Sequence, residues 1–326
     1  GGLIMRRRAL MTIAAASALC LRPAAASEFP DRSLRLIVPF APGGGADVMA
    51  RGAALKMAEL LGQQIVVENR SGGNGTVGAV AVAQARPDGY TMLLATGSEL
   101  ALKPLLEANL PYDPDRDFAP VVLLGITPVV FAVHPSVPVT DIAGLIALAK
   151  ARPGGIDMGN PGAGSIMHVA AALLALRTGV TIQHVPYRGA APAVADASAG
   201  TLASVVSGLP PVLAQARQGR LRILAISTPR RTPAAPEVPT LEEAGIPGFD
   251  MSNAVGLVVP RGSPAAAVAR LNAAANAALR DAEVRRIFLA NGAEPLGSTV
   301  EGHGEFVRRE REQYREWVRL TGVRME

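Results

Sequence analysis

The stretch RLIVPFAPGGGADVMA, residues 35–50, places the tightest constraint on what this chain can fold into. An apolar run at 36–38 ends at Pro39, three glycines follow at 43–45, and an amphipathic segment opens at Asp47. This order predicts a buried strand, a glycine loop and a helix N-terminus. Because the free N–H groups of a helix N-terminus converge beside the positive end of its dipole, the junction suits an anion.

Short apolar runs and helical patterns continue to alternate along the chain. A helical pattern over 47–61 ends at Gly62, QQIVVENR follows at 63–70, and a second helical pattern over 77–85 precedes TMLLAT at 91–96. This rhythm is typical of a parallel sheet with crossover helices. Later strands are expected at 121–127, 129–134, 156–160, 181–187, 201–208, 220–227 and 253–260, and later helices at 141–154, 165–176, 191–200, 263–281 and 299–320.

Two α/β lobes, each with a mixed and largely parallel sheet, fit this pattern. Either Thr140 or Asp141 is expected to cap the helix that stops at Gly154. Ser263 is expected to cap a later helix whose first residue is a proline. The proline-rich stretch RRTPAAPEVPT, 230–240, is predicted to be an exposed connection.

Residues 1–27 are predicted to be a signal peptide with a short extension before it. They contain a basic start at 6–8, an apolar stretch over 9–21 and an A-x-A cleavage signal at 24–26. The apolar stretch is shorter than the about 20 residues of a membrane span. The sequence therefore predicts an exported, soluble protein.

The predicted leader also contains most of the excess positive charge and the sole cysteine. It holds four arginines and no acid, so its removal lowers the formal net charge from +5 to +1. Cys20 could accept a lipid, although Leu19 is larger than the residue such sites prefer. Elsewhere arginines alternate with acids, as in RREREQYREWVR at 308–319, which is typical of a solvated helix face. We expect no nucleic-acid partner and no disulfide.

Motifs of enzymes and cofactor sites are weak. GNGTVG at 73–78 matches G-x-G-x-x-G, but Asp88 comes too early to bind a ribose. The loop at 41–47 lacks the G-K-[ST] ending of a nucleotide-binding loop, and no G-x-S-x-G occurs. The four histidines show no metal-ligand spacing. We expect no cofactor, no metal and no catalysis, with an exported hydrolase as the weaker alternative.

A second glycine loop, NPGAGSIMH at 160–168, repeats the build of the first. Glycines precede Ser165, which stands where a helix cap is expected and which could instead donate to a ligand. Two such loops, one in each lobe, would place two helix N-termini on one cleft. Such a cleft would neutralise a carboxylate without a fixed cation.

Nine stretches resemble the substrate-binding proteins of tripartite tricarboxylate transporters, the Bordetella uptake gene (Bug) family. They run in order from about Phe29 to the C-terminus and together cover essentially all of the chain after the leader. They are DRSLRLIVPFAPGGGADVMAR, VVENRSGGNGTVGA, ARPDGYTMLLATG, LPYDPDRDFAPV, NPGAGSIMH, HVPYRGAAPAVAD, EVPTLEEAGIPGF, GLVVPRGSP and GAEPLGST.

The resemblance implies a periplasmic binding protein of type II, a Venus-flytrap fold that closes over a small organic acid. Lobe 1 would comprise 28–127 and 252–326, and lobe 2 would comprise 128–251. The resemblance further implies a monomer in the periplasm that delivers its ligand to the membrane components of a tripartite tricarboxylate transporter. A ligand-loaded partner of a membrane sensor is the alternative, which sequence does not separate from transport.

In the family, backbone amides and ordered water from the two glycine loops hold the ligand carboxylate. By resemblance, the first loop supplies Phe40, Ala41, Gly43, Gly44, Gly45, Ala46 and Asp47. The second supplies Gly162, Gly164, Ser165 and His168. Wall residues from the ends of other strands are expected to be Thr96, Gly97, Ser98, Tyr187 and Ser207, although Tyr187 could instead pack within its lobe with its hydroxyl bonded inside.

Three departures from the family pattern bear on the ligand. SELALKP at 98–104 would place Glu99 and Lys103 near the cleft rim. Ala203 stands about where amino-acid binders have an aspartate, so we expect a carboxylic acid rather than an amino acid. The small, polar pair at 253–254 replaces a common tryptophan, which predicts a roomier pocket there.

Overall fold

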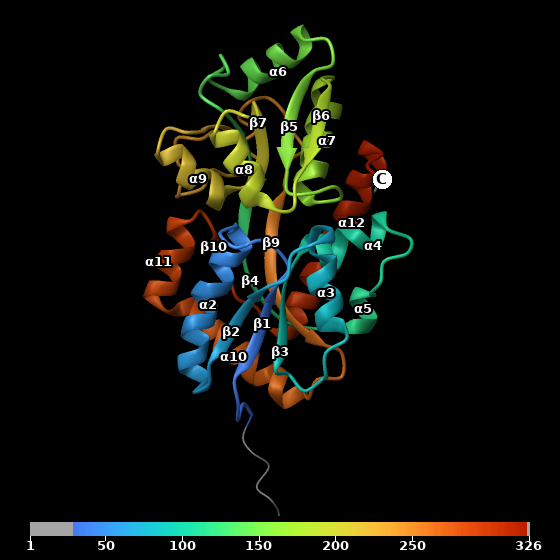
Figure 1. The fold of residues 1–326 in the computed structure, drawn as a ribbon, viewed down its shortest axis with the longest axis vertical. Helices are drawn as coiled ribbons and strands as arrows, with labels where there is room; N and C mark the ends of the chain where they lie inside the picture. The colour runs from blue at the N-terminus through green and yellow to red at the C-terminus, as the bar shows by residue number, and fades with distance from the viewer. Residues whose placement is uncertain (1–28, 325–326) are drawn as a thin grey trace, which may run out of the picture.

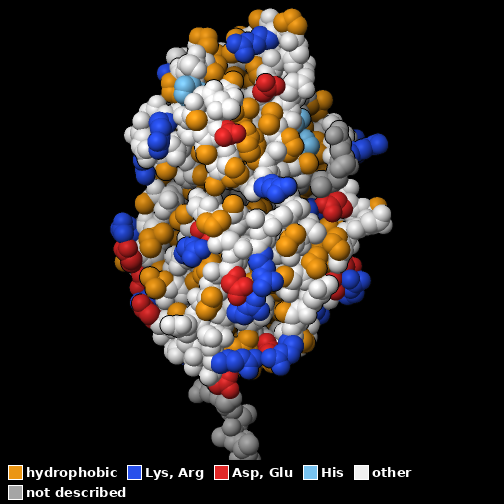
Figure 2. Space-filling view, viewed as in Figure 1, with side chains coloured by type: hydrophobic (Ala, Val, Ile, Leu, Met, Phe, Trp, Pro, Cys, Tyr) orange, Lys and Arg blue, Asp and Glu red, His pale blue; other side chains and the backbone are white. Residues whose placement is uncertain are grey.

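The computed structural model describes residues 29–324, so the predicted signal peptide and Cys20 lie outside the described residues. The described chain is an elongated α/β molecule with two halves stacked along its long axis (Figure 1). No helix within it is both long and apolar enough to cross a membrane. On the face seen in Figure 2, basic and acidic side chains lie side by side over the lower half.

One mixed sheet runs through both halves, in the order β2-β1-β3-β9-β4-β7-β5-β6, with β10 and β8 attached to β4. The strands of the first half are β1 (Leu34–Val38), β2 (Ile65–Asn69), β3 (Thr91–Thr96), β4 (Phe118–Val133), β9 (Ser252–Pro260) and β10 (Glu294–Pro295). Those of the second half are β5 (Ile156–Asn160), β6 (Ile182–Pro186), β7 (Ser204–Gly208) and β8 (Arg222–Ile226).

The two halves are built alike around three parallel strands. β1 pairs in parallel with β2 and β3, and β5 pairs in parallel with β6 and β7. Antiparallel pairs join these triplets, because β9 pairs with β3 and β4, and β4 continues to pair with β7 and β8. The predicted α/β class with a mixed sheet in each half is confirmed.

A single long strand, β4, replaces the two strands predicted at 121–127 and 129–134. Pro128 between them suggested a break, because proline cannot donate to a strand ladder. In the structure, Pro128 is opposite Ser252 at the start of β9, and the next residue, Val129, is opposite Gly208 of β7. The proline thus lies where β4 changes partner, and β4 crosses from one half to the other.

Helices cover both faces of the sheet and mostly follow the predicted ranges. Those of the first half are α2 (Gly45–Leu61), α3 (Thr76–Ala83), α4 (Lys103–Leu106), α5 (Pro114–Asp117), α10 (Ala265–Arg280), α11 (Ala282–Ala290) and α12 (Val300–Thr321), with the 3₁₀-helix η1 (Gly73–Gly75) and the π-helix η2 (Ser98–Leu102). Those of the second half are α6 (Ile142–Ala151), α7 (Ile166–Thr178), α8 (Ala190–Ser198) and α9 (Leu209–Arg217).

The helix ends show where the sequence signals were right and wrong. Asp141 caps α6 by accepting a hydrogen bond from Gly144 N, and Ser165 caps α7. Ser263 does not cap α10, because its hydroxyl donates to Pro260 O and Pro264 occupies the cap position. Helices α9 and α11 were not predicted. The stretch 230–240 is only partly exposed, because side chains such as Ala235 are buried in the second half.

The last long helix, α12, contributes to both halves of the molecule. It contacts β4 and η2 of the first half and α7 of the second half. Tyr314 and Trp317 are buried in the same apolar cluster as Val169 and Leu173 of α7. The last long helix of the stretch 252–326, which the sequence assigned wholly to lobe 1, therefore packs in part against the core of the second half.

Candidate functional site

A narrow cavity lies between the two halves, where the loops after β1, β3, β5 and β7 converge. Its volume is about 50 Å³. It is lined by Phe40, Ala41, Gly44, Gly45, Ala46, Asn74, Thr96, Ser98, Thr127, Pro161, Ser165, Met167, Ala190, Gly208, Pro210, Pro211 and Asn253. Both halves of the molecule thus contribute to its wall.

Among the described residues that line this cavity, none carries a charge. Its polar side chains are hydroxyls and amides, and one of them, Thr127, is buried with no hydrogen-bond partner for Oγ1 within the described chain. A buried hydroxyl normally finds a partner. The cavity therefore offers neutral donors and acceptors that remain available to a ligand.

The first glycine loop is braced from outside the cavity by Asp47. This carboxylate accepts hydrogen bonds from Gly43 N at 3.0 Å, Arg51 Nε at 3.0 Å and Asn69 Nδ2 at 2.9 Å. Burial alone would raise the pKa of Asp47, but these bonds lower it below its ordinary value. Helix α2 has no side-chain cap, because its cap residue is Gly44. The charge of Asp47 shapes the loop, and its carboxylate is already used.

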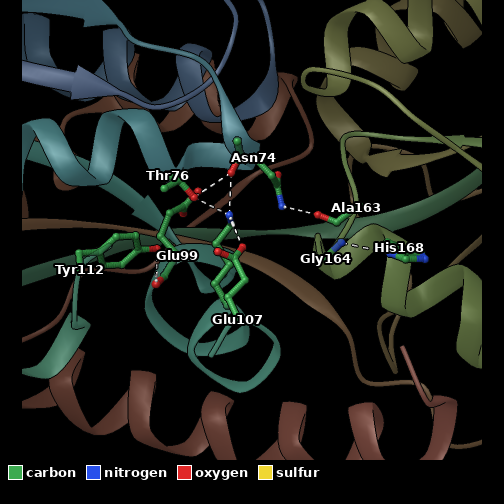
Figure 3. Close-up of polar contacts among 10 residues, drawn as sticks. Asn74, Thr76, Glu99, Glu107, Tyr112, Ala163, Gly164 and His168 are labelled. Atoms are coloured by element: carbon green, nitrogen blue, oxygen red, sulfur yellow. Dashed lines mark hydrogen bonds and ion pairs between the residues drawn. The ribbon is translucent and has the colours of Figure 1, made fainter. Parts of the chain in front are cut away.

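The second glycine loop is braced by neutral groups. Ser165 Oγ accepts from His168 N at 3.1 Å, and Asn160 Oδ1 accepts from Gly162 N at 3.0 Å. His168 Nδ1 accepts from Gly164 N at 3.1 Å (Figure 3). Burial, helped by His184, lowers the pKa of His168 to about 4. At neutral pH the ring is therefore uncharged, as an accepting Nδ1 requires.

The two halves touch at the mouth of the cavity. Asn74, on η1, donates from Nδ2 to Ala163 O of the second loop at 3.3 Å (Figure 3). Asn74 is held at φ 47°, a left-handed conformation that asparagine tolerates better than most residues. Deeper in, a Cβ atom added to Gly45 would lie 3.0 Å from Pro210 Cγ of α9. These contacts leave the cleft almost closed.

Lys103 is buried beneath η1 and does not lie at the cleft rim, so that expectation is wrong. Its side chain is 1% exposed, and Nζ donates to Gly73 O and Thr76 Oγ1, each at 2.6 Å, and to Glu107 Oε1 at 2.8 Å (Figure 3). The ammonium group thus holds the turn that carries Asn74. A buried ammonium group persists because all three of its protons have acceptors.

Glu99 is also buried, so its expected place at the rim is wrong too. Its Oε2 accepts from Thr96 N and Thr96 Oγ1, each at 2.7 Å, while Tyr112 donates to its backbone oxygen (Figure 3). Burial raises the pKa of the Glu99 carboxyl to about 7. Glu99 therefore orients Thr96, which lines the cavity, without facing the cavity itself.

Eight of the predicted site residues line the cavity: Phe40, Ala41, Gly44, Gly45, Ala46, Thr96, Ser98 and Ser165. Six others do not line it, namely Gly43, Asp47, Gly97, Gly164, His168 and Ser207. Gly162 and Tyr187 border an adjoining groove. The Tyr187 hydroxyl donates to Asp196 Oδ2 at 2.7 Å, which is the internal role weighed for it.

Several lining residues were not predicted. Asn74 lies inside the motif at 73–78, whose G-x-G-x-x-G pattern is typical of nucleotide binding and does not indicate this position. Thr127 lies within β4, which was predicted as two shorter strands, and Pro210 lies on α9, which was not predicted. Ala203 lies just before the first residue of β7, whereas the cavity is lined by the last residue of that strand, Gly208. The side chain at position 203 therefore does not contact a ligand in this cavity. The preference for an acid rests instead on the absence of an anionic lining residue.

Known proteins match this chain over nearly its whole length. The family described as tripartite tricarboxylate transporter family receptor matches residues 49–322. Protein BugT of Bordetella pertussis is 37% identical over 321 residues, which cover 98% of each chain. R. palustris Rpa4515 with adipate has a TM-score of 0.88 at 34% identity, and covers 91% of this chain and 99% of its own. MatC from Rhodopseudomonas palustris with bound malate has a TM-score of 0.81 at 32% identity, and covers 89% of this chain and 100% of its own.

Proposed function

Because this chain belongs to the receptor family of tripartite tricarboxylate transporters, we propose that it binds a small organic carboxylate in the cavity between its two halves. The protein would then deliver this ligand to the membrane components of such a transporter. The observation that carries the proposal is the convergence of two helix N-termini, those of α2 and α7, on a cavity without charged lining residues.

A carboxylate fits this cavity better than a cation or an uncharged solute. Two helix N-termini direct N–H groups and positive dipole ends toward an anion. An ammonium group would need an anionic partner, because burying an unpaired charge is costly. The lining offers none among the described residues, so amino acids should bind more weakly than the matching dicarboxylic acids.

Two relatives narrow the ligand class. Their structures contain adipate and malate, which are both dicarboxylates. This chain shares with them its fold and about a third of its sequence. We propose a dicarboxylate, with one carboxylate at the N-terminus of α2 or α7 and the rest of the ligand against Phe40, Met167 and Pro210.

Closure of two lobes over the ligand follows from this proposal. We propose that lobe 1 comprises 28–127 and 252–326, that lobe 2 comprises 128–251, and that the chain hinges where β4 and β9 cross between them. The partner change at Pro128, opposite Ser252, supports that place for the hinge. We also propose that the protein acts in the periplasm as a monomer, and that it binds without turnover.

A thermal-shift screen of residues 28–326 tests the proposed function. The panel contains adipate, malate, tricarboxylates, aromatic acids, amino acids and the neutral diamide of adipic acid. A ligand at 100 times its Kd adds about 2.7 kcal/mol to the free energy of unfolding, which is easily seen. We expect a rise with one or more dicarboxylates and no rise with the diamide. A rise with amino acids or neutral compounds alone would contradict the proposal.

A further inference from the structure

We propose that a groove along α12, away from the cavity, is the surface that docks an acidic segment of the transporter's membrane component. The groove lies between α12, α5 and the ends of β4 and β9. Its volume is about 770 Å³. That space accommodates a peptide segment rather than a single ion. The inference rests on the proposed function only for the identity of the partner.

The groove is more positively charged than the chain as a whole. Its lining includes Arg261, Arg308, Arg309, Arg311 and Arg315, against only two acids, Asp115 and Glu312. Residues 28–326 as a whole have a formal net charge of only +1 once the four arginines of the leader are set aside. The lining therefore holds a local excess of arginine that suits an acidic partner.

Part of this arginine charge is unpaired within the described chain. Arg311 pairs with Asp115, and Arg315 pairs with Glu312. Arg308 and Arg309 are exposed, and neither forms an ion pair within residues 29–324. A hydrogen bond from Arg311, with further attraction from Arg261 and Arg308, lowers the pKa of Asp115 below its ordinary value. Several guanidinium groups thus act together on one carboxylate, as they would on a partner's.

Apolar and neutral groups at the base of the groove favour a peptide over an inorganic anion or a lipid headgroup. Leu100, Phe118 and Val258 line it beside the arginines. His303 lines it too, with a 2% exposed side chain whose Nδ1 has no partner in the described chain. An acidic segment can pair its carboxylates with guanidinium groups and place an apolar side chain on this base.

The groove is linked to the cavity by one short element. In the π-helix η2, Ser98 lines the cavity and Leu100 lines the groove. Arg311 Nη2 donates to Leu100 O at 2.8 Å, which ties η2 to α12. The end of α12 packs on the second half through Trp317. A partner in the groove therefore contacts η2, which also lines the cavity, and α12, whose end packs on the second half, so docking can depend on closure.

Proteoliposomes that contain the two membrane components of the cognate transporter provide the test. The Arg308→Glu/Arg315→Glu variant reverses two charges that line the groove. The Arg286→Glu/Arg319→Glu variant makes the same change of net charge at two exposed arginines that, like Arg315, pair with a glutamate three residues earlier. Binding to the proteoliposomes is measured at low and high salt, and thermal shifts with adipate and malate are measured in parallel.

We expect the groove variant to bind the proteoliposomes at least tenfold more weakly than the unchanged protein, and the control variant to bind within twofold of it. The milder Arg308→Gln/Arg315→Gln variant should fall between. Both charge-reversal variants should keep their thermal shifts with acids. Equal losses in both variants, no loss in the groove variant, or equal binding to protein-free phosphatidylglycerol vesicles would overturn the inference. A missing thermal shift in the unchanged protein would instead count against the proposed function alone.

Discussion

The two glycine loops that face each other across the cavity reach the same shape by different means. In the first half, the loop before α2 has no side-chain cap and is braced by the Asp47 carboxylate and the Arg51 guanidinium. In the second half, the loop before α7 is braced by the Ser165 hydroxyl and the neutral ring of His168. One loop depends on charge and the other on neutral hydrogen bonds.

This difference shows that a binding site can lack charged lining residues although ionisable side chains hold its loops in place. In the first half, the ionisable side chains of Asp47, Glu99 and Lys103 do not line the cavity, and they bond to Gly43 N, Thr96 N and Gly73 O in or beside its wall. The ligand would meet helix N-termini, hydroxyls, amides and apolar side chains, but no charged side chain of the described residues. We therefore expect changes behind the wall to affect stability first and affinity second.

The largest effect on binding should come from filling the space where the halves meet. Gly45→Leu would place a side chain against Pro210, where even a Cβ atom would lie 3.0 Å from Cγ. We expect an affinity loss of more than 100-fold, measured by calorimetry, with a nearly unchanged Tm. In the control Gly44→Ala, φ is −74° and the added Cβ would lie 3.7 Å from Ala41 O, so affinity should change little. Equal losses would show that closure at Gly45 is not the cause.

The next effect should be on stability and confined to the first half. Lys103→Met leaves Glu107 and Thr76 without their buried partner, which typically costs about 3 kcal/mol or more. Chemical unfolding should show this loss, whereas Lys150→Met at an exposed position of α6 should stay within about 0.5 kcal/mol. A small effect at Lys103 would mean that the turn under Asn74 is held by other contacts.

The sequence predicted the parts of this fold that depend on local signals. The strand, glycine loop and helix at 34–61 follow from a short apolar run and three glycines. The burial of Lys103 could not be read in the same way, because its acceptors at Gly73 and Thr76 come from a turn some thirty residues earlier. The apparent break at Pro128 vanished for a similar reason, since its partner strand is distant in sequence.

A direct comparison of the two loops should give unequal losses. Asp47→Asn removes hydrogen bonds to a charged group, worth about 1.5–3 kcal/mol. Ser165→Ala removes a helix cap, worth about 1 kcal/mol. Unfolding in denaturant should therefore rank Asp47→Asn as the more destabilising change. The opposite ranking would remove the distinction between charged and neutral bracing.

The contribution of the neutral His168 ring should be measurable as a loss of stability at low pH. The folded-state pKa of His168 is lowered to about 4 by burial and by His184, whereas an unfolded histidine titrates near its ordinary value of 6.5. Between these values the unfolded state binds more protons, so stability falls as the pH falls through this window. Tm should drop by a few degrees more in the unchanged protein than in His168→Asn. Parallel Tm curves would show that His168 does not contribute.

The smallest effect should be at the contact between the two loops. Asn74→Gly keeps the left-handed backbone and removes only the amide that donates to Ala163 O. A single hydrogen bond of about 0.5–1.5 kcal/mol corresponds to about a twofold to twelvefold faster release of ligand. Stopped-flow displacement, followed by the fluorescence of Trp317, measures that rate. An unchanged rate would mean that this contact does not hold the cleft closed.

The position of a bound acid tests the central claim most directly. The measurement is a crystal structure of residues 28–326 with the acid that gives the largest thermal shift. The account predicts a carboxylate within hydrogen-bond distance of backbone N–H groups at Gly44–Ala46 or around Ser165, with no basic side chain in contact. An acid bound instead in the arginine-lined groove along α12, with the cavity between the halves empty of ligand, would contradict it.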